Sequence, residues 1–134
     1  MTQNTDAWML NQVLDQPEVH DAILITADGL VKAFSAGLDQ DQADSIAAAL
    51  AGVQSTSSAT AMFCRAPADS WRQSLVEFDG GFVVTIRAHD STFLSVATSG
   101  AADVGQVVYR MHEVVAQLGR EMGAELREDV SSGT

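Results

Sequence analysis

The sequence predicts an α+β domain in which a five-stranded antiparallel sheet packs against helices. Apolar residues recur every three to four positions near both ends and in the alanine-rich middle, as in amphipathic helices. Between Trp71 and Thr98 they alternate with period two, as in half-buried strands. With 134 residues, 46% of them hydrophobic, the chain fits one domain over 1–134, with an ordered core over about 7–123 and flexible ends.

The first part of the chain predicts a short helix and a β-hairpin. Apolar residues at helical spacing over 8–14 form the helix, and Pro17 closes it. The aliphatic stretches Val19–Thr26 and Leu30–Ser35 then flank the dipeptide Asp28-Gly29. Because glycine readily takes the positive φ of tight hairpin turns, these two stretches are expected to pair as antiparallel strands.

A long second helix is expected to begin near Asp39 and to reach about Met62. Acidic residues at its start suit the positive end of the helix dipole and the unsatisfied backbone N–H groups there. The run Gln54–Thr60 has weak helix propensity, so the helix is expected to bend or fray in that region. Arg65–Ser70, with Pro67 inside it, predicts an interior loop within the same domain.

Three further strands over 71–98 are expected to form an antiparallel meander, because the turns Asp79-Gly80-Gly81 and His89-Asp90 are short. A last helix follows Gly100, with Gly123 as its expected C-cap. The order is thus αββαβββα, and a sheet with one face covered by helices would bury both apolar patterns. The stripe predicted to be buried on the last helix has a 4-3-4-3-4 spacing: Val104, Val108, Met111, Val115, Leu118 and Met122.

Charge and cysteine content restrict the partners and the compartment. Eighteen acidic residues against seven basic ones give a net charge of -11, which repels nucleic acid and anionic membranes. A single cysteine, Cys64, fits a reducing compartment, and no apolar run is long enough to cross a bilayer. We therefore expect a cytoplasmic protein with no nucleic-acid partner and no direct membrane insertion.

Catalytic and metal-binding patterns are missing from the sequence. The only lysine, Lys32, lies in a predicted strand far from any phosphate-binding glycine loop. Cys64, beside two large apolar residues, is interpreted as a small buried hydrophobe. The histidines are scattered, which does not suit a zinc site, and His112 is expected at a boundary with a local hydrogen bond. The three histidines are His20, His89 and His112. We therefore expect a non-enzymatic protein without cofactor or metal.

The second helix and the strand after the loop are candidate interaction surfaces. Small side chains surround the first half of the helix, and Ile46, Leu50 and Val53 form a 4-3 seam. On one interpretation this seam only packs on the chain's own sheet, as part of the core. On the other, one flank of the helix contacts the sheet while the small flank meets a second copy in a two-fold dimer. The strand 72–78 can lie at a sheet edge, open to pairing. For Trp71 and Phe78 a core role is favoured, and the candidate rim contacts are Arg65, Arg72 and Arg87.

The stretch VHDAILITADGLVKAFSAGLDQDQADSIAAAL, Val19–Leu50, resembles the roadblock/LC7 signature: an apolar strand, an Asp-Gly turn followed by Leu-Val, a second strand and an alanine-rich helix. The resemblance continues through the meander around EFDGGFVVTI and the long last helix. It covers nearly the whole chain, from about Ala7 to Met122. It implies the roadblock/LC7 (profilin-like) architecture.

The resemblance also implies a function. Roadblock/LC7 proteins form homodimers through the second helix and third strand, and the helical face of the joined sheet engages small Ras-like GTPases. The chain is similar to short stand-alone actinomycete members encoded beside a sensor histidine kinase and a Ras-like GTPase, which suggests a complex with such a kinase. An arginine finger is not evident, so no catalytic residue is assigned. The implied dimer or partner interface residues are Ile46, Leu50, Val53 and Arg72.

An alternative interpretation is a PAS-like small-molecule sensor, in which the sheet and last helix enclose a pocket. Its only support is Met111 and Met122 on the last helix, and methionines there more often fill a core. The two hypotheses differ in what they predict. A GTPase adaptor should associate according to its partner's nucleotide state, whereas a sensor should melt at a higher temperature when its ligand is bound.

Overall fold

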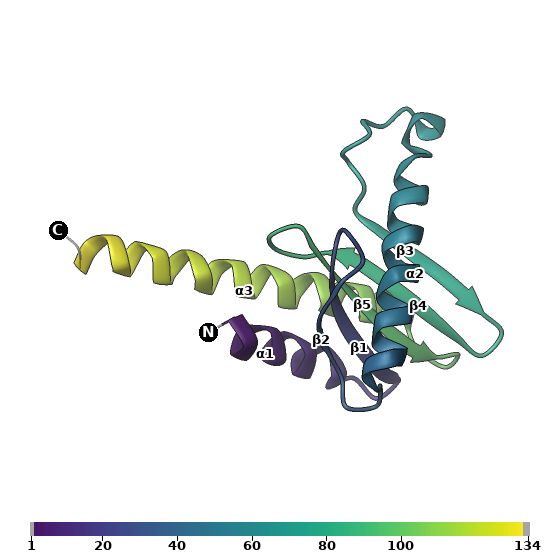
Figure 1. Cartoon of the computed structure of the whole chain (residues 1–134), viewed down its shortest axis with the longest axis horizontal. Coiled ribbons are helices and arrows are strands. Elements are labelled where there is room, and N and C mark those ends of the chain that lie inside the picture. Colours follow the sequence, from purple (N-terminus) through teal and green to yellow (C-terminus); the bar gives the residue numbers. More distant parts are fainter. Residues whose placement is uncertain (1, 133–134) are drawn as a thin grey trace.

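The computed structural model describes the backbone of residues 2–132 and the side chains of residues 5–121. The α+β class and the order αββαβββα are confirmed (Figure 1). The elements are α1 (Thr2–Leu14), β1 (Val19–Thr26), β2 (Val31–Phe34), α2 (Gln40–Ser58), the 3-10 helix η1 (Ala61–Cys64), β3 (Gln73–Phe78), β4 (Gly81–Arg87), β5 (Thr92–Ser99) and α3 (Val104–Ser132).

The five strands form one antiparallel sheet in the order β2-β1-β5-β4-β3. The last strand, β5, lies in the centre and pairs with β1 and β4, for example through Ser95 opposite Ile23 and Val96 opposite Val84. On the outer side of β4, Val76 of β3 pairs with Val83. The strand after the loop is therefore a sheet edge, as predicted.

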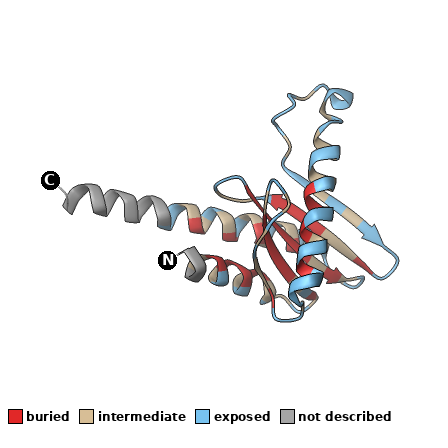
Figure 2. Cartoon of the chain, in the orientation of Figure 1, coloured by how far each residue is buried: buried red, intermediate tan, exposed pale blue. Residues whose placement is uncertain are grey.

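Helices cover both faces of the sheet, not one face as the sequence analysis predicted. Helices α1 and α3 pack on the face formed by residues such as Leu24, Val84 and Leu94. Helix α2 packs on the opposite face, against Ile25 and Phe93. Consecutive residues of β1 and β5 are buried, because these central strands are covered on both sides (Figure 2).

Helix α3 lies with α1 across one face and buries a stripe shifted from the predicted one. Val108 and Val115 lie at the edge of the contact. Met111 and Leu118 are buried as expected, whereas Met122 lies outside the described side chains. The stripe that packs against α1 and the sheet is Val107, Met111, Val114 and Leu118.

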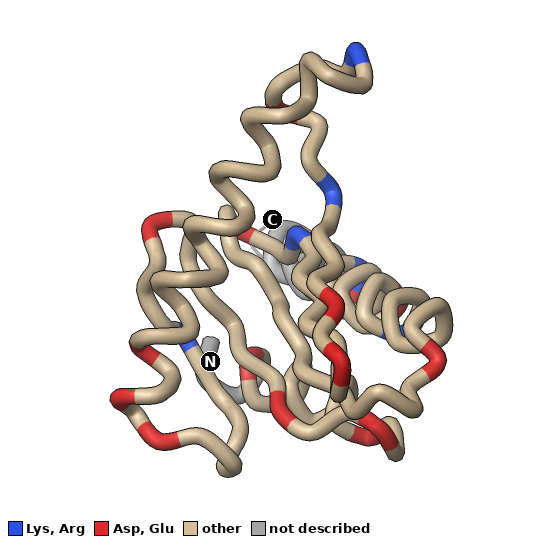
Figure 3. Tube along the Cα trace, turned by 90° about the vertical axis from the view of Figure 1, so that its right-hand side faces the viewer, with Lys and Arg blue, Asp and Glu red and all other residues tan. Residues whose placement is uncertain are grey.

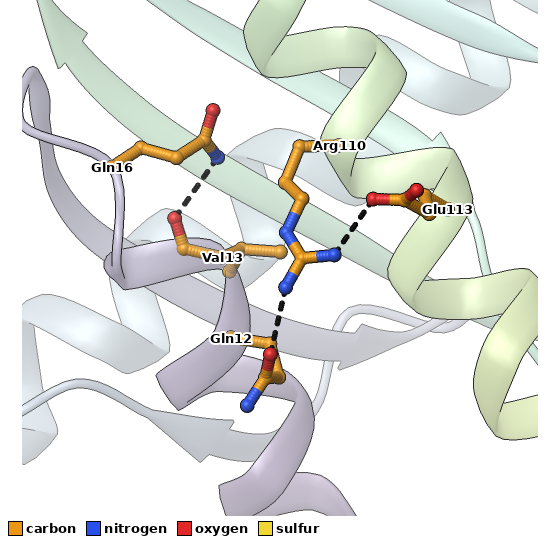
Figure 4. A network of polar contacts seen from close by, with 5 residues as sticks. All are labelled: Gln12, Val13, Gln16, Arg110 and Glu113. Carbon is orange, nitrogen blue, oxygen red and sulfur yellow. Dashed lines mark hydrogen bonds and ion pairs between the residues drawn. The ribbon is translucent and has the colours of Figure 1, made fainter.

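Polar contacts also join α1 to α3 (Figure 4). The guanidinium of Arg110 donates to Oε1 of Gln12 at 2.7 Å and pairs with the carboxylate of Glu113 at 2.7 Å. At the end of α1, Nε2 of Gln16 donates to the carbonyl of Val13 at 3.1 Å. Within the part of the chain that the structure describes, every helix is too short or too polar to span a bilayer.

Helix α2 begins where the sequence predicted. The C-terminal ends predicted for α2 and for α3 were both wrong. Asp39 caps it: its carboxylate accepts from the backbone N–H of Gln42, whose side chain accepts in turn from the N–H of Asp39. The helix continues unbroken to Ser58 and then gives way to η1, instead of reaching Met62. Helix α3 runs past Gly123, which does not cap it, because an interior glycine weakens a helix without ending it.

Candidate interaction surface

Apolar side chains lie open between α2 and the β3 edge. Ile46 and Val53 are half-buried on one flank of α2. Val83 of β4 packs on the face of the sheet that α2 covers. Val76 of β3 pairs with Val83, and paired residues on adjacent strands point to the same face, so Val76 lies on this face too. Phe78, two residues further along β3, shares this face and is 62% exposed. We call this surface the α2–β3 face: Leu38, Ile46, Val53, Val76, Phe78 and Val83.

A groove runs along the α2–β3 face between the first half of α2 and strands β4 and β5. Its volume is about 160 Å³, and apolar side chains of Leu38, Ile46, Leu50 and Val83 line it. Asp21 lies at one wall, where its Oδ1 accepts a hydrogen bond of 2.7 Å from the hydroxyl of Ser35. Pockets for drug-sized ligands are usually larger, roughly 300 Å³ or more, so the groove better suits a protruding side chain.

The far end of α2 is anchored to the start of β3 through Trp71. The indole Nε1 donates to Oγ of Ser57 at 2.9 Å, and the ring meets Phe93 edge-on, 5.4 Å between centroids. The guanidinium of Arg87 donates to the carbonyl of Trp71 at 3.0 Å and lies 5.9 Å from the Phe93 ring. Trp71 is half-buried and packs against the core under α2, so the predicted core role is confirmed only at the edge of that core, and Arg87 is fixed against the indole ring.

Beyond α2, the 3-10 helix η1 projects away from the body of the domain (Figures 1 and 2). Met62 is 82% exposed and Phe63 93% exposed. Cys64, predicted to be buried, is exposed, and its thiol donates to the carbonyl of Ala61 at 3.3 Å. The prediction was wrong because these residues lie beyond the end of α2, where neither helix nor sheet covers them. We call Ala61–Cys64 the tip.

The four residues predicted to form the interface differ in how accessible they are to a partner. Ile46 and Val53 are half-buried and Arg72 is exposed at the start of β3, so all three are accessible. Leu50 is only 8% exposed and belongs to the core under α2, although it also lines the groove. The predicted core role of Phe78 is wrong, because β3 extends past the part of the sheet that α2 covers.

The other residues of this surface escaped sequence reasoning. Val76 and Val83 lie in stretches predicted to be strands, but the sequence does not show which face of the sheet α2 covers. Leu38 carries no signal beyond its place before the capping residue Asp39. Met62 and Phe63 looked like the last turn of a helix.

Charges are unevenly distributed along α2 (Figure 3). Asp41 and Asp44 are exposed in its first turns, next to the capping carboxylate of Asp39. Basic residues lie at its other end, where Arg65 follows the tip and Arg72 precedes β3. The end of the α2–β3 face at the start of α2 is therefore acidic, while the end at the tip carries both arginines.

The histidines lie apart, and none belongs to a catalytic constellation among the described side chains. His89 bonds through Nε2 to the carbonyl of Val115 at 2.8 Å. His112 bonds to Gln73 of β3 and not locally as predicted; burial and the nearby charge of Arg72 lower its pKa. Within residues 5–121, no cluster of three or more metal-ligating side chains forms.

Comparisons with known proteins fit this geometry. The Roadblock/LC7 domain model matches residues 6–98. Two Roadblock/LC7 domain structures from Streptomyces avermitilis are similar to this chain. The first is 28% identical with a TM-score of 0.76, and the match covers 86% of this chain and 95% of that structure. The second is 30% identical with a TM-score of 0.64, and the match covers 87% of this chain and 99% of that structure. Myxococcus xanthus MglB shares the fold at 12% identity, with a TM-score of 0.77 and 90% of each chain covered. No curated protein matches the chain.

Proposed function

The chain belongs to the Roadblock/LC7 family, and on this basis we propose that it is a cytoplasmic, non-catalytic, homodimeric adaptor that binds a small Ras-like GTPase. The family match covers the sheet and α2, the elements that form the α2–β3 face. Members of the family serve as adaptors or regulators. The proposal therefore concerns binding, and it assigns no reacting group.

The single observation that carries the homodimer is the apolar α2–β3 face beside an open sheet edge. A free edge strand presents unpaired backbone N–H and C=O groups, and pairing two β3 strands satisfies both sets. A two-fold axis beside β3 joins the sheets and brings the two α2 flanks together. Half-buried Ile46, Val53 and Val76 would then lose their remaining contact with water.

The GTPase partner follows from the family resemblance, and the structure is compatible with an adaptor role. Because nothing in the sequence marks an arginine finger, the proposal assigns this chain no catalytic side chain in GTP hydrolysis. The resemblance to actinomycete members extends the proposal to a signalling complex that includes a sensor histidine kinase.

Affinity capture on the purified chain tests the GTPase proposal. The lysate of the source cell is passed over the chain with GDP or with a non-hydrolysable GTP analogue. Recovery of a Ras-like GTPase mainly with one nucleotide supports the adaptor, and a histidine kinase in the same eluate supports the larger complex. If neither nucleotide recovers a GTPase, the proposed partner is wrong.

The homodimer is tested separately by sedimentation of the purified chain over a range of concentrations. The expected mass is twice that of the 14.2 kDa chain. A chain that stays monomeric at every concentration would remove the dimer from the proposal while leaving GTPase binding to be decided by the capture experiment.

A further inference from the structure

The tip carries an apolar surface that its own chain leaves largely uncovered. Met62 and Phe63 are adjacent, and each has more than four fifths of its surface exposed. Neighbouring exposed side chains of this size usually mark a contact with another molecule. Their position on a protruding segment suits insertion into a concave surface (Figure 1).

The α2–β3 face of the same chain offers such a concave surface. Its groove is apolar and open, and its volume is about 160 Å³. A dry apolar cavity of about 150 Å³ can hold a benzene ring, so the groove is large enough for one phenyl side chain. Leu38 marks the end of the groove nearest the start of α2.

The two-fold arrangement of the proposed dimer brings tip and groove together. When two α2 helices lie side by side and antiparallel, the end of one lies beside the start of the other. The tip begins at Ala61, shortly after α2 ends at Ser58, and Leu38 precedes the capping residue Asp39. We infer that the tip of each protomer inserts Phe63 into the groove of a second copy; this inference rests on the proposed homodimer.

Charge complementarity supports a second copy as the occupant. The segment around the tip holds Arg65 and Arg72 with a single carboxylate, Asp69. The start of α2, where the groove ends, holds the carboxylates Asp39, Asp41 and Asp44 (Figure 3). Antiparallel helices place the arginines of one protomer near these carboxylates of the other, and the contact is made twice.

The single native cysteine lies in the tip and allows a direct test. In the variant Leu38→Cys, mild oxidation should join the new thiol to Cys64 of the second copy, giving a covalent dimer on a non-reducing gel. Leu30→Cys, on the exposed β1–β2 turn, is the matched control and should not join to Cys64. Equal cross-linking of both variants, or of neither, overturns the inference.

A second test measures dimer affinity. Phe63→Asp should leave the fold intact, because the side chain is 93% exposed, and should raise the dimer dissociation constant at least about tenfold. Leu30→Asp, also an exposed leucine, should leave it unchanged. A wild-type chain that is monomeric throughout overturns the homodimer and this inference together. An unchanged dissociation constant for Phe63→Asp in a chain that does dimerise overturns only the inserted tip.

The competing hypothesis is that the tip contacts a lipid surface instead of a second copy, and it is tested in parallel. Wild-type chain is mixed with phosphatidylcholine vesicles and sedimented. Absence of binding, together with the covalent dimer, supports the inference. Binding that Phe63→Asp abolishes, without cross-linking of Leu38→Cys, assigns the tip to a membrane surface and overturns it.

Discussion

His112 of α3 and Gln73 of β3 are joined by a hydrogen bond of 2.7 Å between Nε2 and Oε1, which ties the last helix to the edge strand of the sheet. Because the amide oxygen accepts, Nε2 of the histidine carries the proton. This contact lies beside the sheet edge at which the proposed dimer forms.

Lowering the pH is expected to reduce stability through His112. Its pKa is lowered from 6.5 in the folded chain, first by burial and then by the charge of Arg72, so the unfolded chain binds more protons. The free energy of unfolding should fall as the pH drops below about 6.5, until the pH passes the lowered pKa. Urea unfolding across this window should show a smaller loss for His112→Gln. An identical loss in both proteins would contradict the expectation.

The buried Leu50 and the half-buried Val53 should respond differently to charge. Leu50→Asp places a carboxylate in the core under α2 and should unfold the monomer, at a cost of about 3 kcal/mol or more. Val53→Asp combined with Val76→Asp should leave a folded monomer, because both side chains are partly exposed. Circular dichroism and sedimentation distinguish the outcomes, and a folded dimer of the double variant would contradict the α2–β3 interface.

The adjacent glycines Gly80 and Gly81 should tolerate alanine very differently. A Cβ added at Gly81 would overlap the backbone carbonyl of Thr98 in β5, whereas the space around Gly80 is open. Gly81→Ala should therefore lower the free energy of unfolding by about 2 to 3 kcal/mol. Gly80→Ala, as the matched control, should change it by less than about 0.5 kcal/mol. Equal melting temperatures for the two variants would contradict the close approach of Gly81 to the carbonyl of Thr98.

The hydrogen bond between Trp71 and Ser57 should stabilise the end of α2. Trp71→Phe keeps an aromatic ring near Phe93 but removes the donor to Ser57, and should cost about 1 kcal/mol. Ser57→Ala should cost a similar amount. Thermal unfolding of the double variant should show less than the sum of the two losses. Strict additivity would mean that the two residues act independently.

Local patterns were sufficient to predict most of the fold. The β1–β2 turn was identified from Asp28-Gly29, and Gly29 indeed has a φ of 88°. Asp39 was identified at the start of α2 from its charge and position, and it forms a capping box. These turn and capping patterns depend on residues that are close in sequence, so they can be recognised from a single sequence without knowledge of tertiary contacts.

The errors arose where distant contacts decide the outcome. Cys64 follows a helical sequence, but no other element reaches far enough to cover it. The apolar stripe of α3 was shifted by one position, because its packing against both α1 and the sheet, and not its spacing, selects Val107 and Val114. Ile46, Leu50 and Val53 formed one seam in the sequence, but Ile46 and Val53 are half-buried whereas Leu50 is buried, because burial depends on the angle at which α2 crosses the strands.

The central position of β5 has a consequence for synthesis on the ribosome. The hairpin β1–β2 emerges early, but its inner neighbour is β5, whose residues 92–99 are translated much later. Until then, Ile23 and Leu24 can pair with β2 on one side of β1, but they lack β5 on the other side. Closing so long a loop is slow. The nascent hairpin therefore keeps the inner edge of β1 unpaired while the residues between β2 and β5 are translated. Folding can be completed only after β5 has left the ribosome, which makes this stage the one most exposed to chaperones and to aggregation.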